Sequence, residues 1–192
     1  VIHSFNEEQD IRLMGGVRKR IPYTYALMVI GTLALTGFPF LSGYYSKDAI
    51  IEFAYLKGGT IGYCAVIVGI FTAILTTIYS WRLIFKTFHG KFSNKKNSLS
   101  SIKESSLFML LPTGLLAIGA IIIGILFKET FIGNETNFWN NSIFFLQNIN
   151  HDHAPNLLIF ITPFIVTITI PISYYLFIKN EKILRKFVLK NE

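Results

Sequence analysis

Lys47 and Asp48 are the residues best suited to chemistry, because both are ionisable and both lie within a long stretch of mostly apolar residues. A lysine that moves between a hydrated and a dry setting alternates between its charged and neutral forms, and a nearby carboxylate restores the charge. We therefore predict that Lys47 is the base of a proton relay and that Asp48 is its modulator or exit group. Glu52 lies one helical turn beyond Asp48 on the same face, which disfavours ionising both carboxylates. We include Glu52 in the predicted relay.

The residues before Lys47 predict an interruption of the helix that carries it. Pro39 lacks a backbone N–H and clashes with the carbonyl one turn earlier, while Gly37 and Gly43 tolerate backbone that helices do not. Residues 22–56 are too many for one straight crossing of a membrane, so we predict non-helical backbone around residues 38–45 between two helical flanks. At membrane depth such a break survives only inside protein or beside a wet cavity. An ionisable side chain beside it marks a candidate functional site.

Two further sets of polar residues are weaker candidates. Thr72, Thr76 and Ser80 share one helical face, and we predict that this polar stripe orders water beside Lys47. His3 lies at the end of an apolar segment, and histidine is a residue type that commonly serves as a relay group near neutral pH. We predict that His3 also belongs to the relay.

Each candidate has a plainer interpretation, which the sequence leaves open. Lys47 can extend its ammonium to the membrane surface, and the two carboxylates, Asp48 and Glu52, can belong to a solvated helix end. Hydroxyls within a helix often donate to carbonyls of their own helix and merely pack. A histidine at the edge of a loop, such as His3, is commonly only solvated.

The elements that position these residues are apolar helices. Of the 192 residues, 52% are hydrophobic, and uncharged runs cover residues 21–46, 58–81, 105–127 and 154–178. Each run exceeds the roughly 20 residues that cross a bilayer, and none has the polar face of a soluble helix. We predict an all-α integral membrane protein with four transmembrane helices, the first discontinuous at Gly37-Pro39. The spans are about 22–56 (broken), 58–88, 105–127 and 154–178, in a single membrane domain over residues 1–192.

The charge pattern predicts how the chain lies in the bilayer. Four spans place residues 1–21, 86–104 and 179–192 on one side and residues 53–60 and 128–155 on the other. Of the 18 lysines and arginines, all but Lys47, Lys57 and Lys128 fall on the first side. Such a bias marks the matrix or cytoplasmic side, so we expect a multi-pass protein of the mitochondrial inner membrane or the bacterial plasma membrane. The charge of +7 is thus topological, and no nucleic acid partner is predicted.

No residues typical of a redox or metal centre appear in the sequence. Cys64 is the single cysteine, and no Gly-rich dinucleotide loop or pair of haem histidines is present. His151 and His153 flank Asp152, but two histidines without a third ligand predict no metal site. We expect no cofactor in this chain.

Two segments carry a resemblance to a known family. Residues 1–52, which read from VIHSF to SKDAIIE, and the later segment YSWRLIFKTFHG closely resemble the antiporter-like subunits of respiratory complex I. That family includes subunit 5 of mitochondrial NADH dehydrogenase and subunit L of the bacterial enzyme. The specific match covers about the first ninety residues. The chain lacks a start methionine, and we expect it to be a C-terminal-middle fragment of such a subunit.

The resemblance implies a function and its residues. In that family a discontinuous helix carries a lysine that takes part in proton translocation, and Lys47 falls on it, with Asp48 on its acidic neighbour. His3 matches a histidine that ends the preceding helix. The implied partners are other membrane-arm subunits and the lipid bilayer, while NADH, FMN, iron–sulfur clusters and quinone belong to other subunits. Alternatives are a subunit of a cation/proton antiporter or membrane-bound hydrogenase, and a structural scaffold without ion traffic.

Overall fold

The computed structural model describes residues 1–92, 102–131, 138, 142 and 155–180. All regular structure within these ranges is helical, which confirms the predicted all-α class. The start of the predicted fourth span, the segment His151–His153 and residues 181–192 lie outside the described residues. Six of the cations counted above lie outside them too: Lys95, Lys96, Lys182, Arg185, Lys186 and Lys190.

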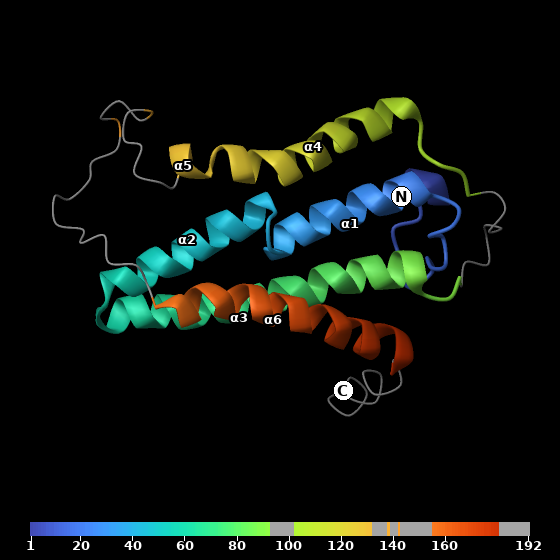
Figure 1. Ribbon diagram of the computed structural model, residues 1–192. Helices are drawn as coiled ribbons and strands as arrows, with labels where there is room; N and C mark the ends of the chain where they lie inside the picture. The colour runs from blue at the N-terminus through green and yellow to red at the C-terminus, as the bar shows by residue number, and fades with distance from the viewer. Residues whose placement is uncertain (93–101, 132–137, 139–141, 143–154, 181–192) are drawn as a thin grey trace.

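Six α-helices and three shorter turns make up the described chain (Figure 1). In chain order the helices are α1 (Pro22–Thr36), α2 (Ser42–Lys57), α3 (Gly59–Ile84), α4 (Leu107–Leu126), α5 (Lys128–Phe131) and α6 (Asn156–Tyr174). A 3₁₀ turn, η1 (His3–Phe5), precedes them, and π-helical turns extend α3 as η2 (Phe85–His89) and α6 as η4 (Tyr175–Lys179).

Three helical segments in the described residues are long and apolar enough to cross a membrane: Gly59–His89, Leu107–Leu126 and Phe160–Lys179. Helix α1 is apolar but shorter. Large apolar side chains point outward from these segments, and Phe108 in α4 is 92% exposed. Water penalises such exposure, so these faces suit lipid or neighbouring membrane proteins. The chain is a multi-pass membrane protein.

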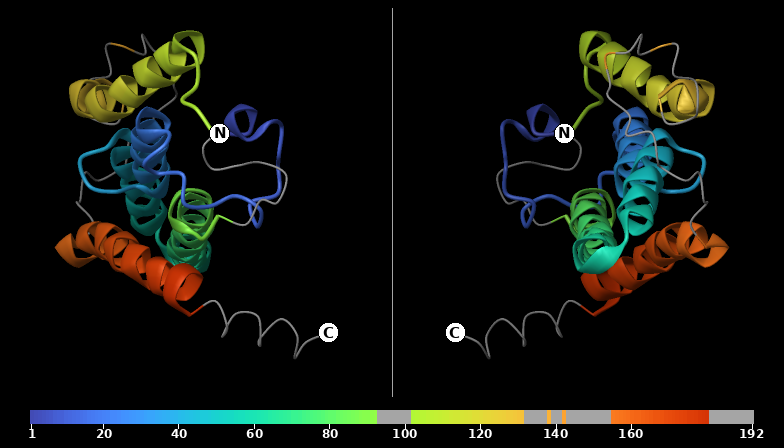
Figure 2. Two further views of the ribbon diagram at one scale, coloured as in Figure 1. Left: turned by 90° about the vertical axis from the view of Figure 1, so that its right-hand side faces the viewer. Right: turned by 90° about the vertical axis from the view of Figure 1, so that its left-hand side faces the viewer.

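The helices pack as a bundle around the end-to-end pair α1 and α2 (Figures 1 and 2). Helix α4 covers one side of this pair, and α3 covers another. Helix α6 packs mainly on α3 and more lightly on α2. The rings of Phe85 and Tyr174 meet at a centroid distance of 5.2 Å, which shows that α3 and α6 end together and run in parallel.

The connector, residues 1–21 before α1, closes one end of the bundle. Its apolar side chains form a core with the end of α3, in which Phe5, Val17 and Ile84 are fully buried. The backbone N–H of Arg18 donates to the carbonyl oxygen of Phe88 at 3.3 Å. The connector, the start of α1 and the end of α3 therefore meet at this end.

A carboxylate from the segment before α4 fixes the start of α1 at the same end. Helix α1 begins at Pro22, where a missing N–H costs nothing. The Glu104 carboxylate accepts hydrogen bonds from the backbone of Tyr23 at 3.0 Å and of Thr24 at 3.3 Å. A negative charge is favourable at a helix N-terminus, so Glu104 ties α4 to α1.

Candidate functional site at the helix break

Helix α1 ends in a Schellman motif. Gly37 adopts the left-handed conformation with φ 81°, where a residue with a Cβ is strained. The N–H of Phe38 donates to the Leu33 carbonyl at 3.0 Å, and the N–H of Gly37 donates to the Ala34 carbonyl at 3.2 Å. The buried Thr36 hydroxyl also donates to Leu33. The break therefore satisfies carbonyls that the end of α1 leaves open.

A tight turn then leads into α2. The N–H of Leu41 donates to the Phe38 carbonyl at 3.3 Å, with Pro39 and Phe40 at the corners. Phe40 has φ 69°, an uncommon value for a bulky residue, and its side chain is 73% exposed. The predicted break is thus confirmed in position, but it ends at Leu41 and not at Tyr45, because α2 already begins at Ser42.

Gly43 has a different role from the predicted one. It lies in the first turn of α2 and not in the break. A Cβ at this position would overlap the carbonyl oxygen of Ala34 at the end of α1. Gly43 therefore permits the close approach of two helix ends, which the sequence pattern did not reveal.

The stem of Lys47 lies against the break. A Cβ added to Gly37 would stand 3.2 Å from Cδ of Lys47, so the side chain passes directly over the end of α1. Helical side chains lean toward the N-terminus of their helix, which directs Lys47 back to this junction. The carbonyl end of α1 carries partial negative charge, which favours a cation there. Lys47 is half-buried and forms no ion pair with any described residue.

Asp48 lies beside Lys47 but does not pair with it. One carboxylate oxygen, Oδ2, is buried and has no hydrogen-bond partner in the described part of the chain. The Tyr44 hydroxyl, one turn earlier, and the Glu52 carboxylate both act electrostatically on the Asp48 carboxylate. The structure therefore brings Lys47, Asp48 and Glu52 to one segment of α2.

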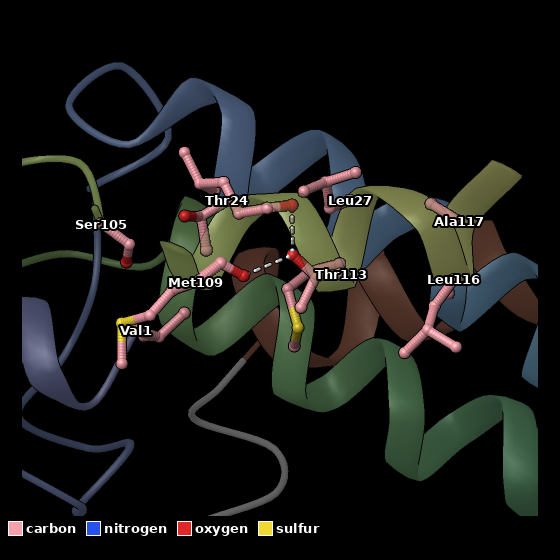
Figure 3. Close-up of a pocket in the computed structure, with 11 residues that line it drawn as sticks. Val1, Thr24, Leu27, Ser105, Met109, Thr113, Leu116 and Ala117 are labelled. Atoms are coloured by element: carbon pink, nitrogen blue, oxygen red, sulfur yellow. Dashed lines mark hydrogen bonds between the residues drawn. The ribbon is translucent and has the colours of Figure 1, made fainter. Parts of the chain in front are cut away.

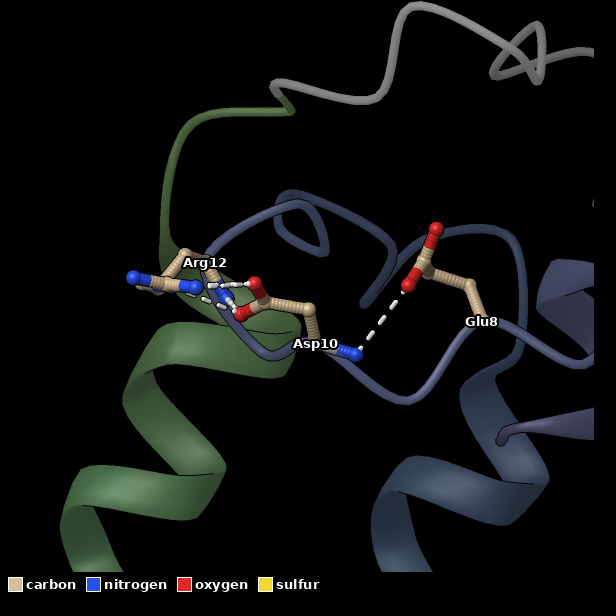
Figure 4. A network of polar contacts seen from close by, with 3 residues as sticks. All are labelled: Glu8, Asp10 and Arg12. Carbon is tan, nitrogen blue, oxygen red and sulfur yellow. Dashed lines mark hydrogen bonds and ion pairs between the residues drawn. The ribbon is translucent and has the colours of Figure 1, made fainter.

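Charges outside the bundle behave differently from Lys47. In the connector, the Arg12 guanidinium donates to both Asp10 carboxylate oxygens at 2.6–3.0 Å, and Glu8 accepts from the Asp10 N–H (Figure 4). The hydrogen bonds from Arg12 hold the pKa of Asp10 below its usual value. In this exposed ion pair Arg12 and Asp10 each keep the other charged, whereas Lys47 has no such partner among the described residues.

His3 is not brought together with Lys47. It lies in η1, at the end of the bundle where α1 begins, whereas Lys47 lies beyond the end of α1 (Figure 1). Its Nδ1 is 3.3 Å from Glu7 Oε1, and both side chains are largely exposed. The predicted relay role of His3 stays a prediction.

The predicted polar stripe on α3 is split between two environments. Thr72 and Thr76 donate to the carbonyls of Val68 and Thr72 at 2.7 Å, as in the plainer interpretation. Ser80 is 5% exposed, and its hydroxyl has no hydrogen-bond partner in the described ranges. The water-ordering role stays a prediction, with Ser80 as the member that needs a partner.

Sequence reasoning missed a second set of hydroxyls, on α6. Thr162, Thr169 and Ser173 are all buried, and their spacing puts them on one helical face. The same spacing is legible in the sequence. Ser173 and Thr162 lack a hydrogen-bond partner within the residues that the structure describes.

Apolar residues line the groove between α1 and α4 (Figure 3). Its volume is about 370 Å³, and Thr24, Met28, Met109 and Thr113 are among its lining residues. It contains no ionisable side chain. Within the described ranges no cluster of three potential metal ligands occurs either. This groove therefore adds no candidate for proton transfer to those at the break.

Known proteins resemble most of this chain. Residues 1–76 match the family described as "NADH:quinone oxidoreductase/Mrp antiporter, TM". The chain is 47% identical to NADH-ubiquinone oxidoreductase chain 5 of Marchantia polymorpha over 146 residues, 76% of this chain and 22% of that protein. It is 49% identical to chain 5 of Dictyostelium citrinum and 45% identical to that of Phytophthora infestans, each over 144 residues, 75% of this chain and 22% of the relative.

These matches extend beyond the ninety residues over which the sequence motifs are specific, and the chain spans about 22% of the length of these relatives. They include the broken helix, Lys47 and Asp48 within residues 1–76. The resemblance seen in the sequence is confirmed: over three quarters of its length the chain is similar to NADH-ubiquinone oxidoreductase chain 5, an antiporter-like membrane subunit of complex I.

Proposed function

We propose that this chain forms a proton-translocating part of the membrane arm of NADH:quinone oxidoreductase, with Lys47 as the relay base. The supporting observation is the position of Lys47, whose stem lies over Gly37 at the break and which has no ion-pair partner among the described residues. A buried cation without a fixed partner gains and loses its proton as nearby charge and water change. Asp48 modulates this equilibrium, with Glu52 next to it.

The proposed setting is a bilayer crossed four times. Helices α1 and α2 together form one discontinuous crossing, and the other three long helical segments form the rest. The end of the bundle with the connector and Lys86 faces the matrix of a mitochondrion or the bacterial cytoplasm. Other membrane-arm subunits and lipid cover the exposed apolar faces. NADH, FMN, iron–sulfur clusters and quinone are bound by other subunits.

The test replaces Lys47 in the intact complex. Lys47→Ala removes the titrating group, so proton pumping per NADH oxidised should be strongly impaired. Assembly should be preserved, because removal of a desolvated charge costs little folding free energy. Lys57→Ala is the matched control, since Lys57 is exposed in the last turn of the same helix. The measurement compares membranes with equal amounts of assembled complex.

Wild-type pumping by the Lys47→Ala complex would contradict the proposal and favour a structural scaffold. A second candidate is a subunit of a cation/proton antiporter, which the family description also names. Purification separates the two: the proposed complex carries a flavin-containing NADH module, whereas an antiporter carries none.

A further inference from the structure

Helix α4 packs on both halves of the broken helix. It runs beside α1 and continues past the junction to the first turn of α2 (Figure 1). The two halves make less contact with each other than either of them makes with α4. The position of α2 relative to α1 therefore depends on α4 as well as on the turn that joins them.

One contact point is Glu104, which precedes α4 in the chain. The residue before α1 is Ile21, whose side chain offers no acceptor for the first N–H groups of the helix. Glu104 supplies this acceptor from far along the chain. Its carboxylate accepts hydrogen bonds from the backbone of Tyr23 and Thr24 and from the Thr24 hydroxyl. Hydrogen bonds to a charged group are strong, so Glu104 anchors the start of α1 to the start of α4.

The other contact point is Gly124, in the last turn of α4. A Cβ added there would stand 2.5 Å from Cα and 3.0 Å from the backbone nitrogen of Ser42, the first residue of α2. Only a glycine lets two backbones approach so closely. The Tyr45 ring also touches Gly124, and the Lys128 ammonium of α5 lies 5.9 Å from the centroid of that ring. The end of α4 therefore fixes the first turn of α2.

Between these two points lies the apolar groove that separates α4 from α1. Its lining includes Met28 and Gly31 of α1 and Thr113 and Ala117 of α4. Apolar contact is not directional, so it does not by itself fix the position of one helix along another. Glu104 and Gly124 are therefore the contacts of α4 that set where the two half-helices lie.

The surroundings of Lys47 depend on both half-helices. Lys47 belongs to α2, but its stem lies over Gly37 at the end of α1. Helix α1 is continuous from Pro22 to Thr36, so a shift at its start is transmitted to its end. Such a shift changes the distance between the Lys47 ammonium and the carbonyl end of α1, whose partial negative charge favours the cation.

We propose that α4 holds the two halves of the broken helix in the relative position that proton transfer by Lys47 requires, with Glu104 and Gly124 as positioning residues. Glu104 fixes the start of α1, and Gly124 fixes the start of α2. Both act through the geometry around Lys47 and exchange no proton themselves. This inference rests on the proposed function, because it names the residues that keep the relay base in place.

The first test is Glu104→Ala in the intact complex. Loss of a helix cap to alanine shifts the equilibrium of α1 by about fivefold toward a state in which its start is detached from α4. Protons pumped per NADH oxidised should fall with the fraction of complexes in that state. Glu104→Gln keeps an oxygen that accepts the same hydrogen bonds and should restore most of the pumping. Glu8→Ala is the matched control, because Glu8 is also partly buried and accepts a backbone N–H at 3.2 Å, but within the connector.

The second test is Gly124→Ala, which forces the end of α4 away from Ser42. Protons pumped per NADH oxidised should fall here too, because α2 then shifts relative to α1. Gly114→Ala is the matched control, since it lies in the same helix and a Cβ there meets nothing within 4 Å. If Gly124→Ala prevents assembly, Thr24→Val takes its place as the smaller change, because it removes only the hydroxyl that donates to Glu104.

Amide hydrogen exchange at the junction provides a readout that does not depend on pumping. The N–H groups of Phe38 and Leu41 form the hydrogen bonds of the break. A junction that is held less firmly opens more often, so both amides should exchange faster in Glu104→Ala and Gly124→Ala than in the two controls. Both measurements use membranes with equal amounts of assembled complex, so a loss of folded protein alone changes neither.

Wild-type pumping per assembled complex in both Glu104→Ala and Gly124→Ala would overturn the proposal, and so would unchanged exchange at the junction. A smaller amount of complex that pumps normally would mean that the two residues only stabilise the fold. If Lys47→Ala abolishes pumping in that case, the relay stands and only the role of α4 is wrong. If the Lys47→Ala complex pumps normally, the proposed function fails and the positioning role fails with it.

Discussion

The junction of α1 and α2 and the first half of α4 both place a proline among apolar residues, but only the junction is broken. Helix α4 continues through Pro112, and α6 continues through Pro163 and Pro171. Pro39 instead lies in a turn between two helices. Proline alone therefore does not break a helix in this chain, although each one removes a backbone donor.

The difference lies in the residues around the proline. At the junction, Gly37 takes a left-handed conformation and Gly43 admits the end of α1, whereas α4 has no positive φ. The junction also carries Lys47 and Asp48, whereas α4 has no ionisable residue. The break and the charges thus occur together, which suggests four ways to test the comparison.

The largest effect on stability is expected from Gly43→Ala. The added Cβ overlaps the Ala34 carbonyl, and backbone on both sides prevents an easy shift. We expect a loss of about 3 kcal/mol, seen as less assembled complex and earlier thermal disassembly. The control is Gly31→Ala in α1, where a Cβ meets nothing within 4 Å. That change should gain about 0.5–1 kcal/mol, as is usual for glycine inside a helix. Equal behaviour of the two variants would refute the close contact.

A smaller loss is expected from Gly37→Ala. The left-handed conformation at φ 81° costs a residue with a Cβ about 1–2 kcal/mol. The new methyl also presses on Cδ of Lys47. Proton pumping per assembled complex should therefore fall further than the loss of stability alone would explain. Thermal disassembly and pumping, measured on the same preparation, test both parts. A stabilised Gly37→Ala complex would show that α1 and α2 form one continuous helix.

The smallest effects are expected from the prolines, and their signs should differ. Pro39→Ala gives the unfolded chain more conformational freedom. Because the native turn already suits a proline, we expect the free energy of unfolding to fall by about 0.4–1 kcal/mol. Pro112→Ala restores a backbone donor inside α4 and should gain about 1 kcal/mol. Shifts of the same sign in thermal disassembly would mean that the two prolines have equivalent roles.

The sequence predicted the helices and the place of the break because their signals are local. Long uncharged runs mark the helices, and Gly37 followed by Pro39 marks a helix end. The predicted end of the break was wrong by about one turn, because the role of Gly43 depends on its contact with Ala34 of another helix. A contact between two helices leaves no trace in the spacing along one of them.

The candidate site was predictable in part for the same reason. Lys47 and Asp48 are conspicuous in an apolar run, but the contact of Lys47 with Gly37 depends on how the chain turns back. Thr72 and Ser80 are indistinguishable by spacing, yet one is exposed and the other is buried against neighbouring helices. This difference depends on how the helices pack, which the spacing along α3 does not show.

The most direct test of the relay keeps the charge and removes the ability to titrate. In Lys47→Arg the cation remains, but arginine stays protonated because its pKa is far above the working pH. Protons pumped per NADH oxidised should fall well below the wild-type value in membranes with equal amounts of assembled complex, while Lys57→Arg should pump normally. If the Lys47→Arg complex pumps at the wild-type rate, a titrating lysine is not required, and Lys47 is only a fixed charge at the broken helix.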